Sequence, residues 1–252
     1  MYAFEQAIIE LFNNSNISFD FEQKGHLLSS PVLNIKFIPN VSEKIVDCQE
    51  ILDTPHLHLW EDIYMSNSRL VISRISSLLG LNKRIHGRET IVTHISQKEF
   101  DDFLVENHLN GSTRSKFRYG LYHHQGLVGV AGFGRSCPID YLGKTYRSHE
   151  LIRFCNKRDV TVVGGLSKLL TTFTKQQKPQ HIMTYIDKEW SNGENFLKLG
   201  FRLVAQTEPE TFFIANDLKR YRQHEVINNP VDMKHWQKIT NQGNYKFIKI
   251  LE

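Results

Sequence analysis

The chain has 252 residues, a formal net charge of +4 and a pI near 8.8, and its three cysteines, Cys48, Cys137 and Cys155, lack metal-ligand spacing. An apolar content of 40% supports one large core or two smaller ones and excludes wholesale disorder. No apolar run approaches the ~18 residues that a membrane-spanning helix needs. We therefore expect a cytoplasmic protein (host cytoplasm if a phage encodes it) with no membrane partner, and the charge mildly favours an anionic partner such as DNA.

Patterns in residues 1–90 predict a small α/β unit. Apolar residues at helical spacing predict helices, and alternating apolar residues between turn signals predict strands. The expected helices cover 2–13, 43–52 and 67–81, and the expected strands cover 31–39 and 57–60. A bridge over 84–96 leads to the next part of the chain.

Residues 91–216 predict a mixed α/β sheet, because strands alternate with helices after an initial hairpin. Helices are expected over 97–108 and 164–177, and another lies within 191–204 before a short strand. The other expected strands cover 118–124, 127–135, part of 146–157, 180–187 and 210–216. Residues 217–252 form a basic, aromatic extension that is either an extra strand or an arm packed elsewhere.

The stretch SNGENFLKLGFRLV, from Ser191 to Val204, resembles the helix-to-strand signature of the GNAT acyltransferase superfamily. Asn192 opens it, Phe196 takes the helical aromatic position, and Gly200 with Phe201 makes the corner. Glycine is suited to that corner because it adopts the left-handed conformation that ends a helix.

A second group, VVGGLSKLL, resembles the family's cofactor loop. Backbone N–H groups at a glycine-rich helix start can hold a pyrophosphate, so the resemblance implies an acyl-CoA contact at Val163, Gly164, Gly165 and Asn192. The family has Arg or Gln close to its glycines, whereas Arg158 stands further upstream here. The alternative is that the glycines only allow close packing of a helix on a strand.

HELIRF, TYID and NFLKLGF resemble the Mom family of phage DNA-modification enzymes, a GNAT-like branch that transfers a group to adenine. The resemblance implies that Arg153 orients an anionic group, that Asp187 beside Tyr185 acts as base or orienter, and that His108 assists proton transfer. Phe196 departs from this pattern, because the family has a tyrosine there. Each residue also has a structural alternative. Arg153 would form an ion pair with Glu150, Asp187 would cap the end of a strand, and His108 would be a residue at the end of a helix.

Residues 4–90 resemble a nuclease of the very-short-patch-repair type, of the kind carried by homing-endonuclease-like phage proteins that share LIRFC, VVGGLSKL and EWSNG segments. This resemblance rests on Glu5, the strand around Asn34, Lys44, Cys48 and the LHLWED segment. Asn34 replaces the metal-binding aspartate, and the segment that would bring the histidine ligands is missing. A neutral amide holds Mg²⁺ poorly, so we expect a degenerate restriction-endonuclease-like domain without a metal.

Three hypotheses follow for a chain with domains at 1–90, 91–216 and 217–252. The first is a GNAT-like transferase acting on DNA bases, and the second is a Mg²⁺-dependent homing-type endonuclease or nickase. The third is a non-enzymatic DNA-binding or inhibitor protein. In each case DNA phosphates would contact basic side chains, unless these form only a solvated face. The candidates are Arg114, Lys116, Arg118, Lys219, Arg220 and Arg222.

Overall fold

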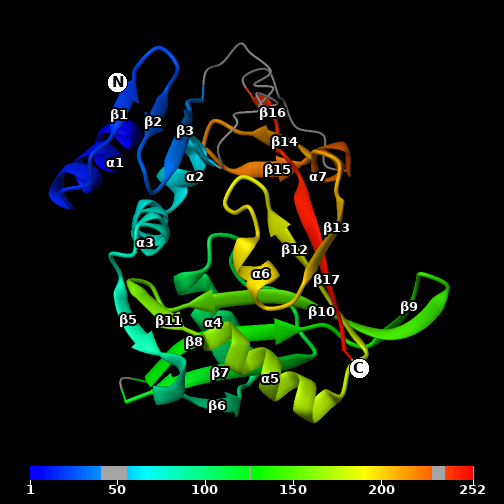
Figure 1. Ribbon diagram of the computed structural model, residues 1–252. Helices are drawn as coiled ribbons and strands as arrows, with labels where there is room; N and C mark the ends of the chain where they lie inside the picture. The colour runs from blue at the N-terminus through cyan, green and yellow to red at the C-terminus, as the bar shows by residue number, and fades with distance from the viewer. Residues whose placement is uncertain (41–55, 125, 229–235, 252) are drawn as a thin grey trace. The chain divides into compact units, whose positions relative to one another are not determined.

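The computed structural model describes residues 1–40, 56–124, 126–228 and 236–251 (Figure 1). The chain forms two compact units, and neither is one continuous stretch. The first comprises Met1–Ile72, Ile186–Gly193 and Gln206–Tyr245, and the second comprises Ser73–Tyr185, Glu194–Ala205 and Lys246–Glu252. The expected boundaries at 90 and 216 stay a prediction. No helix among the described residues is long and apolar enough to cross a membrane.

The first unit contains a four-stranded sheet in the order β1-β2-β3-β4, in which only β3 and β4 run parallel. Helix α1 (Ala3–Asn14) covers one face, where Phe4 meets Phe37 edge-on with ring centroids 5.6 Å apart. The strands are β1 (Asp20–Glu22), β2 (Leu27–Ser29), β3 (Asn34–Ile38) and β4 (His56–Trp60). The first helix and both strands that the sequence predicted here are confirmed, whereas the β1–β2 hairpin was not expected. The predicted helix over 43–52, with Lys44 and Cys48, lies outside the described residues.

A three-stranded sheet from the C-terminal part of the chain completes the core of this unit. Ile38 and Trp60 pack against Ile214 and Ile239, and all four are buried. This sheet has the order β15-β14-β16 and consists of β14 (Thr211–Ile214), β15 (Arg220–Arg222) and β16 (Gln237–Thr240). Two short helices, α2 (Glu61–Ser66) and α7 (Gln223–Asn228), accompany these strands. The expected C-terminal extension is therefore part of a folded core.

The second unit holds most of an eight-stranded sheet in the order β13-β17-β12-β10-β8-β7-β6, with β9 paired to β10. Its strands are β6 (Ile91–His94), β7 (Phe117–His123), β8 (Gly126–Phe133), β9 (Cys137–Tyr141), β10 (Lys144–Asn156), β12 (His181–Asp187), β13 (Arg202–Gln206) and β17 (Asn244–Ile250). Strand β5 (Lys83–His86) pairs in parallel with β11 (Val160–Val163). The helices are α3 (Ser68–Leu78), α4 (Gln97–Asn107), α5 (Gly165–Gln177) and α6 (Glu194–Lys198), with a 3₁₀ turn at Gly87–Glu89. The mixed α/β fold class is confirmed.

Helices α4 and α5 cover opposite faces of this sheet. On the α5 face, Phe173 stacks on Phe133 with centroids 3.8 Å apart and meets the ring of His149 at 5.2 Å. On the α4 face, Phe100 belongs to a buried cluster with Val130 and Cys155. Val130 and Phe133 are an odd number of residues apart on one strand, so they point to different faces.

Phe173→Ala tests this core. Phe173 is fully buried among aromatic rings, so its truncation leaves a cavity and should lower the free energy of unfolding by about 3–5 kcal/mol. Val105 is 63% exposed on α4, and Val105→Ala should change that free energy by no more than about 0.5 kcal/mol. Urea denaturation of the two variants measures both values. Equal losses would show that Phe173 is not a core residue.

Candidate active site

Strand β10 pairs with both neighbours, but to very different extents. Its antiparallel pairing with β8 continues from Leu151 to Asn156, whereas its parallel pairing with β12 consists of Ser148–His181, His149–Ile182 and Glu150–Met183. One residue further, the hydroxyl of Thr184 donates to the carbonyl of Leu151 at 2.9 Å. Beyond Glu150 the two parallel strands therefore no longer share a backbone ladder, and a side-chain hydrogen bond joins them instead.

A β-bulge in β10 lies where the pairing with β12 ends. The register against β8 shifts between Leu151 and Arg153. His149 contacts Phe173 on the α5 face, whereas Cys155 lies in the cluster on the α4 face. Residues an even number apart share a face in a regular strand, so the bulge has exchanged the faces of the residues that follow it.

The bulge brings Glu150 and Arg153 to the same face of β10, although they are three residues apart. Burial raises the pKa of Glu150, and the charge of Arg153 opposes that rise. Strand alternation places Tyr185 of β12 on the face away from Ile182, which lines a pocket beside α5. Tyr185 is 40% exposed, and the ammonium group of Lys246 lies 5.9 Å from its ring centroid. Glu150, Arg153 and Tyr185 thus belong to the sheet face that α4 covers.

His108 follows the last residue of α4. Its Nδ1 accepts a hydrogen bond from the backbone N–H of Asn110 at 3.0 Å, which leaves the ring proton on Nε2. Burial lowers the pKa of His108 to about 3, and the charges of Arg153 and Arg74 lower it further in the same direction. The charge of Arg153 therefore acts on His108, whose imidazole is uncharged at neutral pH, and the catalytic roles of both residues stay a prediction.

Arg74 is a member of this group that the sequence did not reveal. It belongs to α3, and its charge also acts on the buried thiol of Cys155, whose pKa burial raises to about 12. That thiol donates to the carbonyl of Asn107 at 2.9 Å. An arginine on an amphipathic helix has no local signal that would mark it as part of a site.

Asp187 and Asn192 fall in the first unit, whereas the other predicted catalytic residues fall in the second. The Asp187 carboxylate accepts from the backbone N–H of Glu189 at 2.9 Å. Its carbonyl accepts from Trp190 and Ser191, so Asp187 organises the turn that ends β12. This arrangement matches the strand-end cap that was the structural alternative for Asp187, and its catalytic role stays a prediction.

The predicted cofactor loop opens α5. Gly164 has φ +75°, in the left-handed region, and its carbonyl accepts from Lys168 at 3.0 Å. A Cβ on Gly165 would come within 2.9 Å of Leu121 and Val162 side-chain atoms. Gly165 therefore allows close packing, while the first N–H groups of α5 lack carbonyl partners within the helix. The two roles proposed for these glycines are compatible.

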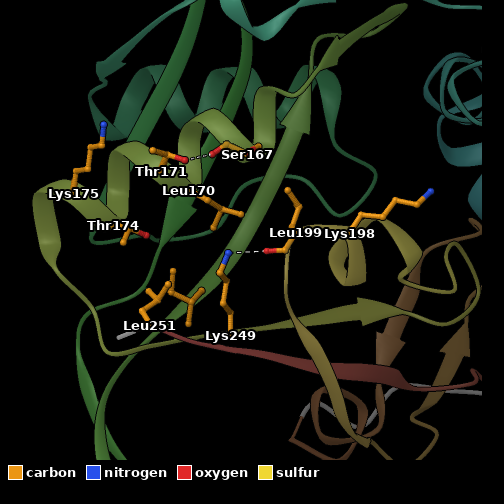
Figure 2. A pocket seen from close by; sticks show the side chains of 10 residues that line it. Ser167, Leu170, Thr171, Thr174, Lys175, Lys198, Leu199, Lys249 and Leu251 are labelled. Atoms are coloured by element: carbon orange, nitrogen blue, oxygen red, sulfur yellow. Dashed lines mark hydrogen bonds between the residues drawn. The ribbon is translucent and has the colours of Figure 1, made fainter.

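A pocket of about 420 Å³ runs along α5 toward α6 and the end of β17 (Figure 2). Its wall includes the hydroxyl side chains of Ser167, Thr171 and Thr174, and its apolar part includes Leu170 and Ile182. Lys175, Lys198 and Lys249 also line it, and none of the lining residues in the described part of the chain carries a carboxylate. Figure 2 shows the Lys249 amine donating to the Leu199 carbonyl, at 2.7 Å. The volume and the charges suit an anionic ligand of drug size.

Two residues that suggested a nuclease, Glu5 and Asn34, form hydrogen-bonding contacts within the first unit. Glu5 is fully buried and contacts Nδ1 of His26 at 2.6 Å. The amide oxygen of Asn34 accepts from the backbone N–H of Ser30 at 3.0 Å. Over the residues that the structure covers, no three His, Cys, Asp or Glu side chains gather in a way that could hold a metal ion.

The basic residues predicted to contact DNA differ in their surroundings. Arg114 and Lys116 are exposed in the second unit, and Arg118 donates to Gln97 at 3.2 Å. In the first unit, each basic residue of 219–222 has a carboxylate partner. Lys219 lies 3.0 Å from Asp217, Arg222 lies 3.2 Å from Glu210, and Arg220 lies 2.5 Å from Asp62. A role in DNA binding stays a prediction for all six.

No known protein family and no curated protein matches this chain. Among solved structures, an acetyltransferase of Bacillus subtilis in complex with CoA is 14% identical, with a TM-score of 0.41 over 65% of this chain and 99% of that one. A histone acetyltransferase HPA2 and related acetyltransferase from Corynebacterium glutamicum is 12% identical, with a TM-score of 0.41 over 65% and 97%. A GNAT family acetyltransferase from Elizabethkingia anophelis with acetyl-CoA bound is 12% identical, with a TM-score of 0.35 over 65% and 99%. A likeness at this level carries no conclusion about activity, and the Mom and nuclease resemblances stay predictions.

His108→Asn tests the electrostatics of this site. Folding keeps the imidazole of His108 neutral, whereas in the unfolded chain it takes up a proton near pH 6.5. The contribution of His108 to the free energy of unfolding is therefore present above pH 6.5 and is lost as the pH falls toward 3. Asparagine keeps an acceptor for the Asn110 N–H but does not titrate. The melting temperature of the variant should therefore fall less than that of the wild type between pH 7 and pH 5. His124→Asn, at an exposed position, should show the same fall in melting temperature between pH 7 and pH 5 as the wild type. If His108→Asn also showed the wild-type fall, His108 would not be held neutral by the fold.

Proposed function

We propose that the second unit is an acyltransferase that takes its acyl group from acyl-CoA. The end of the backbone pairing between β10 and β12 at Glu150 carries this proposal. The donor has a narrow chain with amide groups, and strand backbone outside a ladder offers hydrogen-bonding groups to such a chain. The bulge at the same place brings the side chains of Glu150 and Arg153 to one face of β10.

The residues around α5 fit the phosphate-bearing part of this donor. The start of α5 provides backbone N–H groups and the positive end of the helix dipole. Ser167, on the first turn of α5, begins the pocket that Lys175, Lys198 and Lys249 line, with no carboxylate from the residues that the structure describes. Since the donor carries several phosphate charges, this distribution of charge favours its binding.

The donor, when bound, supplies an acyl group activated as a thioester. The carboxylate of Glu150 accepts the proton that the attacking amine loses as its nitrogen bonds to the acyl carbon and the carbon–sulfur bond breaks. Burial raises the pKa of Glu150, which makes its carboxylate a stronger base than an exposed one. Arg153 holds an anionic group of the acceptor through its guanidinium fork. His108 stays neutral and is suited to hydrogen bonding more than to carrying a proton.

The acceptor that we propose is a base in DNA. The resemblance of HELIRF and TYID to the Mom segments supports this choice, together with the exposed charges of Arg114 and Lys116. For the endonuclease alternative, the described residues offer no grouping of metal ligands that favours it. The binding-only alternative predicts the same charges but no chemical product.

Titration with acetyl-CoA tests the donor. The wild-type protein should give a saturable heat signal, and Ser167→Asp should weaken binding at least about tenfold because it places a carboxylate among the donor's phosphates. An aspartate in the first turn suits the helix dipole, so the variant should stay folded. Ser112→Asp, at an exposed position in the same unit, should bind as the wild type does. No heat signal with the wild-type protein would refute the choice of donor.

Mass spectrometry of nucleosides tests the acceptor. DNA from cells that express the wild-type protein should contain a nucleoside with added mass, and Glu150→Gln should reduce its yield at least about a hundredfold, because glutamine cannot accept the proton. Glu106→Gln, on the exposed side of α4, should leave the yield unchanged. An unmodified nucleoside profile from a protein that binds acetyl-CoA would exclude DNA as the acceptor while retaining the donor.

A further inference from the structure

The first unit contains a buried polar group centred on Glu189, in the turn after β12. Glu189 is 4% exposed, and its Oε1 accepts a hydrogen bond from the indole N–H of Trp60 at 2.9 Å. Its backbone carbonyl accepts from the N–H of His58 at 2.9 Å. Two hydrogen bonds to β4 therefore depend on the position of this one residue.

Arg220 of β15 approaches the same tryptophan from another segment. Its guanidinium pairs with both carboxylate oxygens of Asp62, at 2.5 Å and 2.9 Å, and lies 5.1 Å from the Trp60 ring centroid. Asp62 is 1% exposed, so this is a buried ion pair. Trp60 thus contacts both the carboxyl group of Glu189 and the guanidinium that attaches β15 to α2.

The charges around Glu189 do not balance when its carboxyl group is ionised. Burial raises the pKa of Glu189 to about 8, and the negative charges of Asp187 and Asp62 act in the same direction, against Arg220. Lys188, the next residue in the turn, donates to Gln206 at 2.9 Å and lies 5.5 Å from the Tyr245 ring. His58 lies 3.4 Å from the amide of Gln242. Arg220, already paired with Asp62, is thus the cation that acts on this group.

We propose that Glu189 is a proton-controlled latch: its neutral carboxyl group holds the Trp60 side chain of β4, on which Arg220 of β15 also packs, and ionisation loosens both contacts. The neutral group accepts the Trp60 N–H at little cost in a dry environment. Ionisation would place a third negative charge beside Asp187 and Asp62 with one guanidinium to neutralise them. Because the folded state retains the proton above the pH at which an unfolded glutamate loses it, the attachment is strongest below about pH 4.5 and is lost progressively as the pH rises to about 8.

The indole N–H signal of Trp60 in a nuclear magnetic resonance titration measures the proton directly. Between pH 6 and pH 9.5 this signal should shift with a midpoint near 8 in the wild-type protein. Glu189→Gln, which keeps the acceptor oxygen, should abolish the shift, and Asp187→Asn should move the midpoint to lower pH. A Trp60 signal that does not move over this range would refute the latch.

Limited trypsin digestion measures the loosening itself. Cleavage after Arg220 and Arg222 should accelerate at least about fivefold relative to Glu189→Gln when the pH is raised from 7 to 9. Comparison of the two proteins at each pH cancels the effect of pH on trypsin. Glu208→Gln, exposed in the same unit, should behave as the wild type does. Equal acceleration in wild type and Glu189→Gln would show that Glu189 does not control cleavage at Arg220 and Arg222.

Discussion

Strand β10 pairs with β8 over a longer stretch than with β12, and the arrangement of side chains in the second unit depends on this difference in pairing. Its pairing with β8 persists to Asn156, while its pairing with β12 ends at Glu150. The bulge between Leu151 and Arg153 reconciles the two, because an extra residue on one strand bends it and increases its twist. The same bulge determines which side chains share a face, so an irregularity of the backbone decides the chemistry that the site can perform.

The elements of the fold were largely predictable because their signals are local. The apolar spacing of α1 and the Ser96 cap of α4 each lie within a few residues of what they specify. The bulge has a weaker signal: HELIRF breaks strict alternation at Leu151-Ile152, but two adjacent apolar residues also occur in regular buried strands. Without the bulge, Glu150 and Arg153 would point to opposite faces. The sequence named Arg153 and His108 through a family resemblance, but it could not reveal that Arg74 joins them or that His108 is neutral.

The division into units was harder to foresee for a different reason. Hydrophobic patterning shows that a residue is buried, but it does not show which distant segment buries it. Ile38 and Trp60 look like ordinary strand residues, and their partners Ile214 and Ile239 lie in the last part of the chain. For the segment 217–252 the sequence leaves two possibilities open, an extra strand or an arm packed elsewhere. In the structure, the guanidinium of Arg220 is neutralised by the buried Asp62.

In each unit a titratable side chain stays uncharged because burial and the charges around it disfavour its ionised form. In the second unit two guanidinium groups act on one imidazole, which sheds its proton. In the first unit the charges of Asp62, Asp187 and one guanidinium act on Glu189, whose carboxyl group retains its proton. Transfer of an unbalanced charge to a dry environment costs more than shifting a pKa by several units. A group that stays neutral for this reason is most sensitive to any change that wets it or removes its charged neighbours, so both His108 and Glu189 report on whether their surroundings remain closed.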